Sequence, residues 1–353
     1  MVIPNRGFTP KNKLRLGFVP LNDCAPIAVA EEMGIFKRLG LDVEISRELG
    51  WASVRDKIIY GHLDAAQSIA GIAIALGLGI NEMRCEVAVP MVLNLHGNAI
   101  TLSTEVGPDK IGRGEGLRQY LASSWKKERP FTLAATHRYA SHYSLLKSWL
   151  ARHGVVSPEH VEIIFLPPSL MPRSLKAGHI DGYCVSEPWN SESIIAGTGW
   201  CPVTSAEISR GHPEKVLLVS GNFLNENKEQ SIALVAALLE ACQLCQSPEF
   251  REELISILAR QAYTGATQEV LRNSLGPTFY TGFERVSTNG FHIFYGDSMN
   301  CPSIDKASWV LSELRNAGTI PEGTCGALSR IFREDLYHAA ELCLLESRPK
   351  QAV

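Results

Sequence analysis

Several polar residues of this 353-residue chain stand where a strand-like run gives way to a helix-like run, which is where α/β sheets bind small ligands. Trp51 follows Gly50 at the start of one such helix-like run. Its indole face and N–H would lie beside unpaired backbone N–H groups and the positive end of the helix dipole, which together favour an anion. The alternative interpretation is that Trp51 packs against a neighbouring helix.

A second helix-like run begins with Tyr139-Ala140-Ser141-His142, where Ser141 is the expected N-cap. His142 would then lie in the first turn. A neutral imidazole at that position can donate one hydrogen bond to a ligand, and a charged imidazole can donate two. A purely structural role for this histidine is the alternative.

Gly97 and Asn98 lie between two strand-like runs, and Gln67 ends another. The missing Cβ of Gly97 would let a ligand approach the backbone, while the side-chain amide of Asn98 would supply hydrogen-bond donors. A tight hairpin turn is the alternative interpretation of Gly97. Gln67 adds an uncharged amide at a strand end.

Lys215 and Glu187 are the charged residues nearest to such positions. Lys215 precedes the apolar run 216–220, and a lysine at a strand entrance is usually a solvated flank. Glu187 lies at a strand-to-helix turn, with no second carboxylate near it in the sequence for acid–base catalysis. The glycine-rich nucleotide motifs and the hydrolase, metalloprotease and EF-hand motifs are absent. We therefore predict no catalytic residue, no metal ligand and no cofactor.

The composition restricts the class of protein. Lys and Arg number 34 against 37 Asp and Glu, so the net charge is −3 and there is no basic field for nucleic acid. The longest apolar stretch, residues 69–80, is too short to span a bilayer, and residues 1–12 show no secretory signal. The nine scattered cysteines fit reduced thiols, and the lone pair Cys242 and Cys245 fits helix packing. We therefore expect a cytoplasmic protein with no direct binding to nucleic acid or membrane.

Short strand-like runs alternate with longer helix-like runs, which predicts an α/β fold with mainly parallel sheets. The predicted strands span residues 14–19, 41–45, 63–67, 131–135, 161–166, 181–185 and 216–220. The predicted helices span residues 25–38, 51–60, 141–153, 170–177 and 188–196. Glycine-rich stretches at 104–116 and 197–204 indicate two crossings between lobes. We expect one lobe from residues 1–103 with 204–353 and a second from residues 104–203.

Four stretches of the sequence resemble the nitrate- and bicarbonate-binding proteins of ABC importers, the NrtA and CmpA type. They are LGFVPLNDCAPIAVAEEMGIFKRLGLDVEISRELGWASVRDKI within residues 14–67, VLNLHGNAITLS at 92–103, SEPWN at 186–190 and HPEK at 212–215. The resemblance runs from about residue 13 to about residue 320. It implies a two-lobed periplasmic-binding-protein-like fold of type II, which closes around a small oxyanion.

Position and resemblance together indicate the ligand-binding residues Trp51, Gln67, Gly97, Asn98, His142 and Lys215. Lys215 falls where the nitrate binder has Lys and the bicarbonate binder has an acidic residue, and Gln67 falls where the transport proteins usually have His. Nitrate is planar and only accepts hydrogen bonds, so it suits N–H donors, a fixed positive charge and a flat face. A bicarbonate hydroxyl would lack an acceptor, at a cost of about 1–3 kcal/mol. We therefore expect nitrate or nitrite as the ligand.

The ends of the sequence depart from the importer pattern, because they lack a signal and a lipid-anchor cysteine. In this respect the chain is similar to the cytoplasmic nitrate/nitrite sensors of the NasS type. That resemblance implies a sensor that sequesters an RNA-binding antiterminator, an ANTAR protein like NasT, and releases it when the anion binds. The alternative is a substrate-binding subunit of an ABC nitrate or bicarbonate importer. An enzyme of thiamine-pyrimidine synthesis, which shares the broader fold, is disfavoured because its cysteine-rich iron motif is absent.

Overall fold

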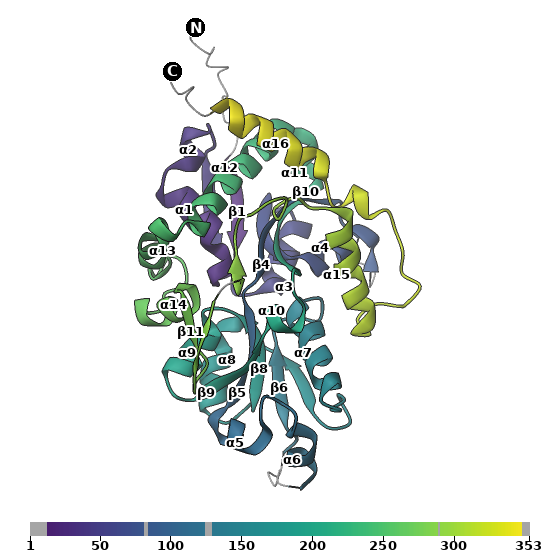
Figure 1. The fold of residues 1–353 in the computed structure, drawn as a ribbon. Helices are drawn as coiled ribbons and strands as arrows, with labels where there is room; N and C mark the ends of the chain where they lie inside the picture. The colour runs from purple at the N-terminus through teal and green to yellow at the C-terminus, as the bar shows by residue number, and fades with distance from the viewer. Residues whose placement is uncertain (1–12, 81–83, 124–128, 289, 348–353) are drawn as a thin grey trace.

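The computed structural model describes residues 13–80, 84–123, 129–288 and 290–347, which form two α/β lobes (Figure 1). Each lobe is built on one sheet, and the lobe that holds β1 lies above the lobe that holds β5 and β9 in this view. A small sheet of two strands, β11 (Thr278–Tyr280) and β12 (Arg285–Ser287), accompanies them. The α/β fold class predicted from the sequence is therefore confirmed.

The first lobe contains a six-stranded sheet in the order β13-β4-β10-β3-β1-β2. Its strands are β1 (Leu14–Phe18), β2 (Val43–Arg47), β3 (Ala65–Ile69), β4 (Val87–His96), β10 (Pro213–Ser220) and β13 (His292–Ile293). Its helical elements are η1 (Asn22–Cys24), α1 (Ala25–Glu32), α2 (Ile35–Arg38), α3 (Trp51–Ile59), α4 (Ala70–Leu78), α11 (Gly221–Glu226), α12 (Lys228–Gln246), α13 (Arg251–Leu258), α14 (Gln268–Leu275), α15 (Ile304–Asn316) and α16 (Glu334–Ser347).

Helices cover both faces of this sheet. Leu217 and Val219 of β10 pack with residues of α1, α12, α13 and α16, whereas Val216 and Leu218 pack with residues of α3, α4 and α15. Successive side chains of a strand point to opposite faces, so the part of a strand that has apolar helix faces on both sides is itself apolar at successive positions. This requirement explains why β10 has a continuous apolar run where a half-exposed strand would alternate.

The second lobe contains a five-stranded sheet in the order β7-β6-β8-β5-β9. Its strands are β5 (Asn98–Ser103), β6 (Thr132–Ala135), β7 (Glu162–Phe165), β8 (Gly182–Ser186) and β9 (Gly199–Thr204). Its helices are α5 (Pro108–Ile111), α6 (Leu117–Ser123), α7 (Ser141–Arg152), α8 (Met171–Lys176), α9 (Trp189–Ile195) and α10 (Ser205–Ile208). Phe279 of β11 packs with Ala99 and Cys201, so the small sheet lies against this lobe.

The chain leaves the first sheet at Gly97, between β4 and β5, and returns between Thr204 and Pro213. The predicted crossings at 104–116 and 197–204 are therefore wrong, because residues 98–103 form β5 and residues 199–204 form β9 of the second sheet. Residues 98–103 and 204–208, which the prediction placed in the first lobe, belong to the second lobe. Both sheets are also mixed and not mainly parallel, because β10 is antiparallel to β3 and β4 while β5 is antiparallel to β8 and β9. A strand that arrives directly from the other lobe enters its sheet from the opposite end, which the strand–helix alternation alone does not reveal.

The parallel part of each sheet is held by the same kind of ion pair. In the first lobe, the carboxylate of Asp64, just before β3, accepts from the backbone N–H of Arg15 at 2.8 Å and from its guanidinium at 2.6 and 3.0 Å. In the second lobe, Asp181, just before β8, accepts from the backbone N–H of Thr132 at 2.8 Å and from the guanidinium of Arg129 at 2.6 and 2.8 Å. Each carboxylate joins the entrances of two neighbouring parallel strands.

The cysteines and long helices fit a packed interior. None of the nine cysteines, all of which the structure describes, is in a disulfide, and Cys242 and Cys245 are buried in α12 as predicted.

Among the described residues, no single helix is long and apolar enough to cross a membrane. The helical segments Lys228–Gln246 and Pro248–Leu258, which are bent by 83° relative to each other, would together be long and apolar enough, by length and composition only.

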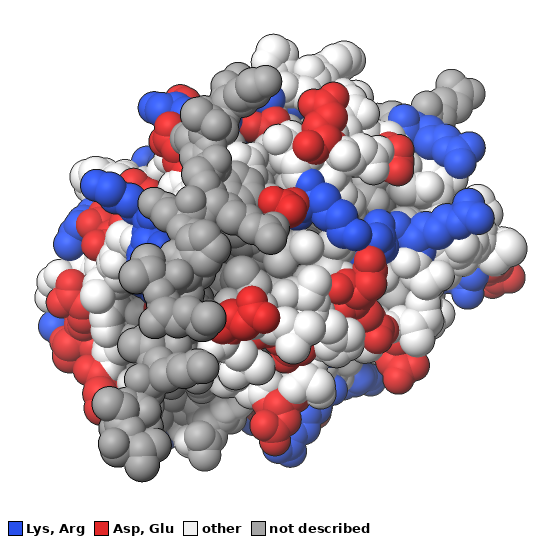
Figure 2. Space-filling model, turned by 90° about the horizontal axis from the view of Figure 1, so that it is seen from above, with Lys and Arg blue, Asp and Glu red and all other residues white. Residues whose placement is uncertain are grey.

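Charged side chains of both signs are interspersed on the face seen from above the first lobe (Figure 2). Neither the basic nor the acidic side chains visible there form a continuous field. A continuous basic field is what holds a polyphosphate backbone. The visible part of this face is therefore mixed in charge, as is the chain with its small net charge.

We predict that Asp181→Asn lowers the free energy of unfolding by about 2 kcal/mol, because a neutral amide loses the ion pair with Arg129 and has one acceptor oxygen where Asp181 uses two. The matched variant Asp64→Asn should cost less, since Asp64 is 14% exposed against 2% for Asp181. Urea denaturation followed by circular dichroism measures both. An equal or larger loss for Asp64→Asn would contradict the role of burial.

Candidate functional site

The ammonium of Lys215 is fully buried at the junction of the two lobes. Its Nζ lies 2.6 Å from Glu214 Oε1, 2.9 Å from Asp23 Oδ2 and 2.9 Å from Ser186 Oγ. Burial alone would lower the pKa of Lys215, but the carboxylates of Asp23 and Glu214 outweigh it and raise the pKa above its ordinary value. Lys215 therefore stays charged, with partners on both sheets.

Glu214 extends this contact across the lobe junction. Its Oε2 accepts hydrogen bonds from Asn98 Nδ2 at 2.6 Å and from the hydroxyl of Ser141, the first residue of α7. Burial opposes the charged form, but the charge of Lys215 outweighs it, and the pKa of Glu214 is lowered to about 2. The carboxylate of Glu214 thus lies at the start of α7, where the sequence analysis expected a ligand.

His142 stays neutral within the same cluster. Its Nδ1 lies 2.7 Å from Thr136 Oγ1, and its Nε2 lies 3.0 Å from Asn98 Oδ1 and 3.1 Å from Ser186 Oγ. Burial, reinforced by the charge of Lys215, lowers the pKa of His142 to about 3. At neutral pH the imidazole is therefore a hydrogen-bonding group without a charge.

Asp23 closes the cluster from the first lobe. Its Oδ1 accepts a hydrogen bond from Asn94 Nδ2 at 3.0 Å and lies 3.1 Å from His292 Nε2. Burial would raise the pKa of Asp23, but Lys215 and His292 together hold it well below its usual range. Two charged carboxylates and one ammonium therefore leave Asp23, Glu214 and Lys215 with a net charge of −1, since 1 − 2 = −1.

Trp51 and Gln67 border the cluster with unsatisfied donors. Lys215 Nζ lies 5.4 Å from the centre of the Trp51 ring, and Gln67 is paired with Leu217, two residues along β10 from Lys215. The oxygen of the Gln67 amide accepts a hydrogen bond from the N–H of Val19 at 2.9 Å. By contrast, Trp51 Nε1 and Gln67 Nε2 are buried with no hydrogen-bond partner among the described residues.

Glu187 supplies a third buried carboxylate beside the junction. Its Oε2 accepts a hydrogen bond from the N–H of Ser191 at 3.1 Å, whereas its Oε1 has no hydrogen-bond partner among the described residues. Burial raises the pKa of Glu187 to about 7. This side chain can therefore be either a protonated donor or a charged acceptor near neutral pH.

The structure brings four of the predicted ligand-binding residues into this cluster: Trp51, Asn98, His142 and Lys215. Lys215 is buried within β10 and is not a solvated flank. The predicted cap at Ser141 is wrong, because Ala140 is the N-cap and Ser141 is already helical with its hydroxyl on Glu214.

Two further predictions need correction. Gln67 lies inside β3 and not at its end. The space beside Gly97 (φ +87°) is occupied by the ring of His292, which lies 2.8 Å from where a Cβ would be. A neighbouring side chain, and not only a possible ligand, therefore explains glycine at this position.

The sequence analysis missed Asp23, Ser186 and Glu214 as members of the site. All three lie inside the stretches that carried the family resemblance, NDCAP, SEPWN and HPEK, which was the available signal. The argument that bicarbonate would find no acceptor is therefore wrong, because the site contains buried carboxylates. An analysis of single residues at strand ends could not predict that these carboxylates would lie in the site, because they come close to it only through the fold.

Two sheets with a buried polar cluster at their junction define a two-lobed protein of the periplasmic-binding-protein-like fold. The chain belongs to the NMT1-like family, whose model matches residues 7–259. In the crystal structure of the periplasmic nitrate-binding protein NrtA from Synechocystis PCC 6803 the same fold recurs, with a TM-score of 0.87 and 24% identity over 96% of this chain and 91% of that one.

Two curated relatives from Synechocystis sp. are more similar in sequence. The nitrate import ATP-binding protein NrtC is 35% identical over 340 residues, and the bicarbonate transport ATP-binding protein CmpC is 37% identical over 336 residues. Each match covers 94% of this chain but only 50% of the relative. The chain therefore spans about half the length of these relatives, whose names point to two different anions.

We predict that the protein loses stability as the pH falls from about 6.5 to 5. Burial lowers the pKa of His142 to about 3, and burial lowers that of His96 and His137 to about 4, from an ordinary 6.5. In this window the unfolded chain binds protons that the folded chain does not, so protons favour unfolding.

Burial also lowers the pKa of His212, which adds to this effect. Burial raises the pKa of Glu187 to about 7 and raises those of Glu31 and Glu313, and these groups act in the opposite direction. We expect the four histidines to outweigh them, because an ordinary histidine pKa of 6.5 lies at the upper end of the window.

Urea denaturation at pH 7 and pH 5 measures this effect. The variant His137→Gln should weaken the pH dependence, because it removes one of the imidazoles whose pKa burial lowers. Equal stability at the two pH values would contradict the neutral state of the buried imidazoles.

Proposed function

We propose that this chain binds nitrate or nitrite between its lobes. The observation that carries the proposal is the pair of buried donors, Trp51 Nε1 and Gln67 Nε2, that have no partner among the described residues. A buried donor left unpaired costs about 1–3 kcal/mol, so a ligand that only accepts hydrogen bonds would remove that cost. Nitrate and nitrite are such ligands, and the indole offers a flat face for them.

The carboxylates of the site favour the same choice over bicarbonate. Both oxygens of Glu214 and both of Asp23 already face donors or the ammonium of Lys215, so a ligand hydroxyl would compete for occupied acceptors. Two described carboxylate oxygens of this cluster, Asp23 Oδ2 and Glu187 Oε1, have no hydrogen-bond partner. Asp23 Oδ2 nevertheless lies 2.9 Å from the ammonium of Lys215, and burial raises the pKa of Glu187 to about 7, which disfavours its charged acceptor form. The names of NrtA and NrtC support nitrate, whereas the name of CmpC supports the alternative.

Entry of the ligand requires the lobes to separate, because Lys215, His142 and Asn98 are all fully buried. Contacts across the junction then re-form around the bound anion, which makes the chain a clamp with open and closed states. Glu214 lies at the helix start that an anion would also favour. We therefore propose that Glu214 and the ligand repel each other, and that this repulsion limits the affinity.

We expect calorimetry to detect nitrate binding, and Trp51→Phe to weaken it by about 10- to 150-fold through loss of one charge-assisted bond. The matched control is Trp149→Phe, which alters a tryptophan in the core of the second lobe. Bicarbonate that binds more tightly than nitrate would contradict the choice of ligand. Equal effects of the two tryptophan variants would contradict the role of the indole N–H.

The variant Glu214→Gln should raise nitrate affinity by about tenfold, because it removes a buried negative charge while keeping the shape and one acceptor of the side chain. The corresponding Glu207→Gln, at a partly exposed carboxylate of α10, is the control. The same titrations measure both variants. Weaker binding by Glu214→Gln would show that this carboxylate supports the anion site and does not oppose it.

We further propose that the chain is a cytoplasmic sensor that sequesters a NasT-like RNA-binding antiterminator and releases it when nitrate or nitrite binds. The support is the resemblance of the sequence to sensors of the NasS type and the net charge of −3, which gives this chain no net basic field for RNA. If nitrate favours the closed state and the partner favours the open state, each ligand must weaken the other by the same factor. A factor of about 100 requires about 2.7 kcal/mol.

We expect size-exclusion co-elution of the chain with its antiterminator partner to be lost at saturating nitrate. The partner should weaken nitrate binding by the same factor in calorimetry. A complex that saturating nitrate leaves unchanged would contradict the sensor role while leaving the anion site intact. No complex, together with nitrate binding and association with importer subunits, would favour the second candidate.

That second candidate is the substrate-binding subunit of an ABC importer for nitrate or bicarbonate. The names of the relatives favour it, because NrtC is a nitrate import protein and CmpC a bicarbonate transport protein. The clamp would then deliver the anion to a membrane complex and would have no antiterminator partner.

A further inference from the structure

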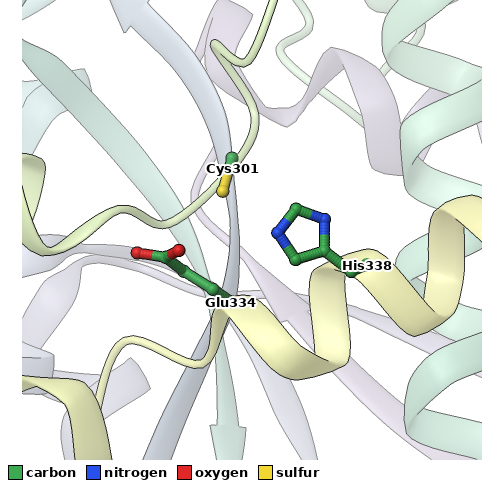
Figure 3. Close-up of side chains that lie close together, drawn as sticks. All are labelled: Cys301, Glu334 and His338. Atoms are coloured by element: carbon green, nitrogen blue, oxygen red, sulfur yellow. The ribbon is translucent and has the colours of Figure 1, made fainter.

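Three metal-ligating side chains gather outside the anion site. Cys301 lies in the loop between β13 and α15, Glu334 is the first residue of α16, and His338 follows one helical turn later (Figure 3). Their ligand atoms all lie within 4.8 Å of one another. Cys301 is buried and His338 is exposed, so the group runs from the protein interior to the surface.

Strand β4 holds both halves of this group in place. The N–H of Val92 donates to the carbonyl of Asn300 at 2.9 Å, which fixes the loop before Cys301. Three residues earlier, the N–H of Val89 donates to the carbonyl of Ile331 at 2.7 Å, and the N–H of Arg333 donates back to Val89 at 2.9 Å. The proximity of Cys301 to α16 therefore rests on backbone hydrogen bonds to one strand.

We propose that Cys301, Glu334 and His338 bind a zinc ion, with water as the fourth ligand. A thiolate, an imidazole and a carboxylate form a ligand set that suits zinc and excludes calcium and magnesium, which take oxygen ligands. Tetrahedral bonds of about 2.0–2.3 Å place ligand atoms about 3.3–3.8 Å apart. The group must therefore contract by about 1 Å, which rotation of the exposed His338 side chain can supply.

The surroundings of His338 fit a metal ligand. Its Nδ1 lies 2.9 Å from Glu341 Oε2, and the other ring nitrogen points toward Cys301 and Glu334 (Figure 3). A carboxylate on the second nitrogen fixes the tautomer that leaves the first nitrogen free to bind metal, and it is the usual outer partner of a zinc-bound histidine. Residues i, i+4 and i+7 of one helix, namely Glu334, His338 and Glu341, thus act together.

The charges of the neighbouring groups favour a dication. Binding replaces the S–H bond of Cys301 by a zinc–sulfur bond and releases the thiol proton to the solvent. The thiolate then joins the carboxylates of Glu334 and Glu341 around the ion. Lys306 brings a positive charge close to Cys301, but its ammonium is held by the carbonyls of Ser298 at 2.9 Å and Cys301 at 2.7 Å. Arg333, next to Glu334, is paired with Asp335.

A zinc ion bound by these three residues would cross-link the start of α16 to the loop that precedes α15. The proposal does not rest on nitrate binding, because none of the three ligands belongs to the anion cluster. Sequence analysis predicted no metal ligand, since Cys301 stands far from Glu334 and His338 and the i, i+4 pair has no cysteine beside it. The tertiary contacts with β4 are what complete the set.

Titration of the reduced, metal-free full-length protein with Co²⁺, and then with Zn²⁺ in competition, tests this site. We expect one Co²⁺ per chain with tetrahedral d–d bands and a thiolate-to-cobalt charge-transfer band. Cys301→Ser should abolish the charge-transfer band, and His338→Ala, at an exposed position that folding tolerates, should weaken binding at least about tenfold. Glu341→Gln should weaken it by about tenfold while keeping the spectrum.

The matched control is Cys343→Ser, which alters a different cysteine that lies on α16 and outside the group. It should retain the spectrum and the affinity of the unmodified protein. Absence of the charge-transfer band in the unmodified protein would overturn the proposal. So would a band that survives in Cys301→Ser, or one that disappears only in Cys343→Ser.

Discussion

A lysine ammonium removed from water keeps its charge only if opposite charges and acceptors surround it, and this constraint organises the lobe junction. The ammonium of Lys215 satisfies this constraint because oxygens of Asp23, Glu214 and Ser186 lie 2.6–2.9 Å from its Nζ. Asp23 and Glu214 come from the first lobe, whereas Ser186 ends β8 of the second. One buried charge thereby couples the position of a strand in each lobe.

The same cluster determines what the junction can accept. Its net charge is already negative, so an incoming anion gains most from donors that the cluster leaves unpaired, such as Trp51 Nε1 and Gln67 Nε2. Glu214 accepts a hydrogen bond from Ser141 at the start of α7, the position that would otherwise attract the anion. The carboxylate of Glu214 at that point keeps the lobes joined in the absence of ligand. The free energy of binding is therefore the difference between the contacts across the junction with the anion bound and those without it.

The fold supports this arrangement by having the chain cross the junction twice. Gly97 makes the outward crossing between two strands of different sheets, and β10 makes the return as an antiparallel strand between β3 and β4. The start of β10 is therefore both a sheet element and a wall of the site. Asp64 and Asp181 fix the parallel strands at the opposite ends, so each lobe keeps its own register when the lobes move.

The sequence by itself determined many of the elements and pointed to four residues that meet at the lobe junction. Strand and helix periodicity located β1, β2, β3, β6, β7 and β8 within two residues, and the start of α3 at Trp51 followed from Gly50. Tertiary structure alone decided the mixed strand directions, the burial of Lys215 and its carboxylate partners. The physical reason is range. Propensity and periodicity act between residues a few positions apart, whereas Asp23, Ser186 and Lys215 meet only after two lobes have formed and excluded water from the charges between them.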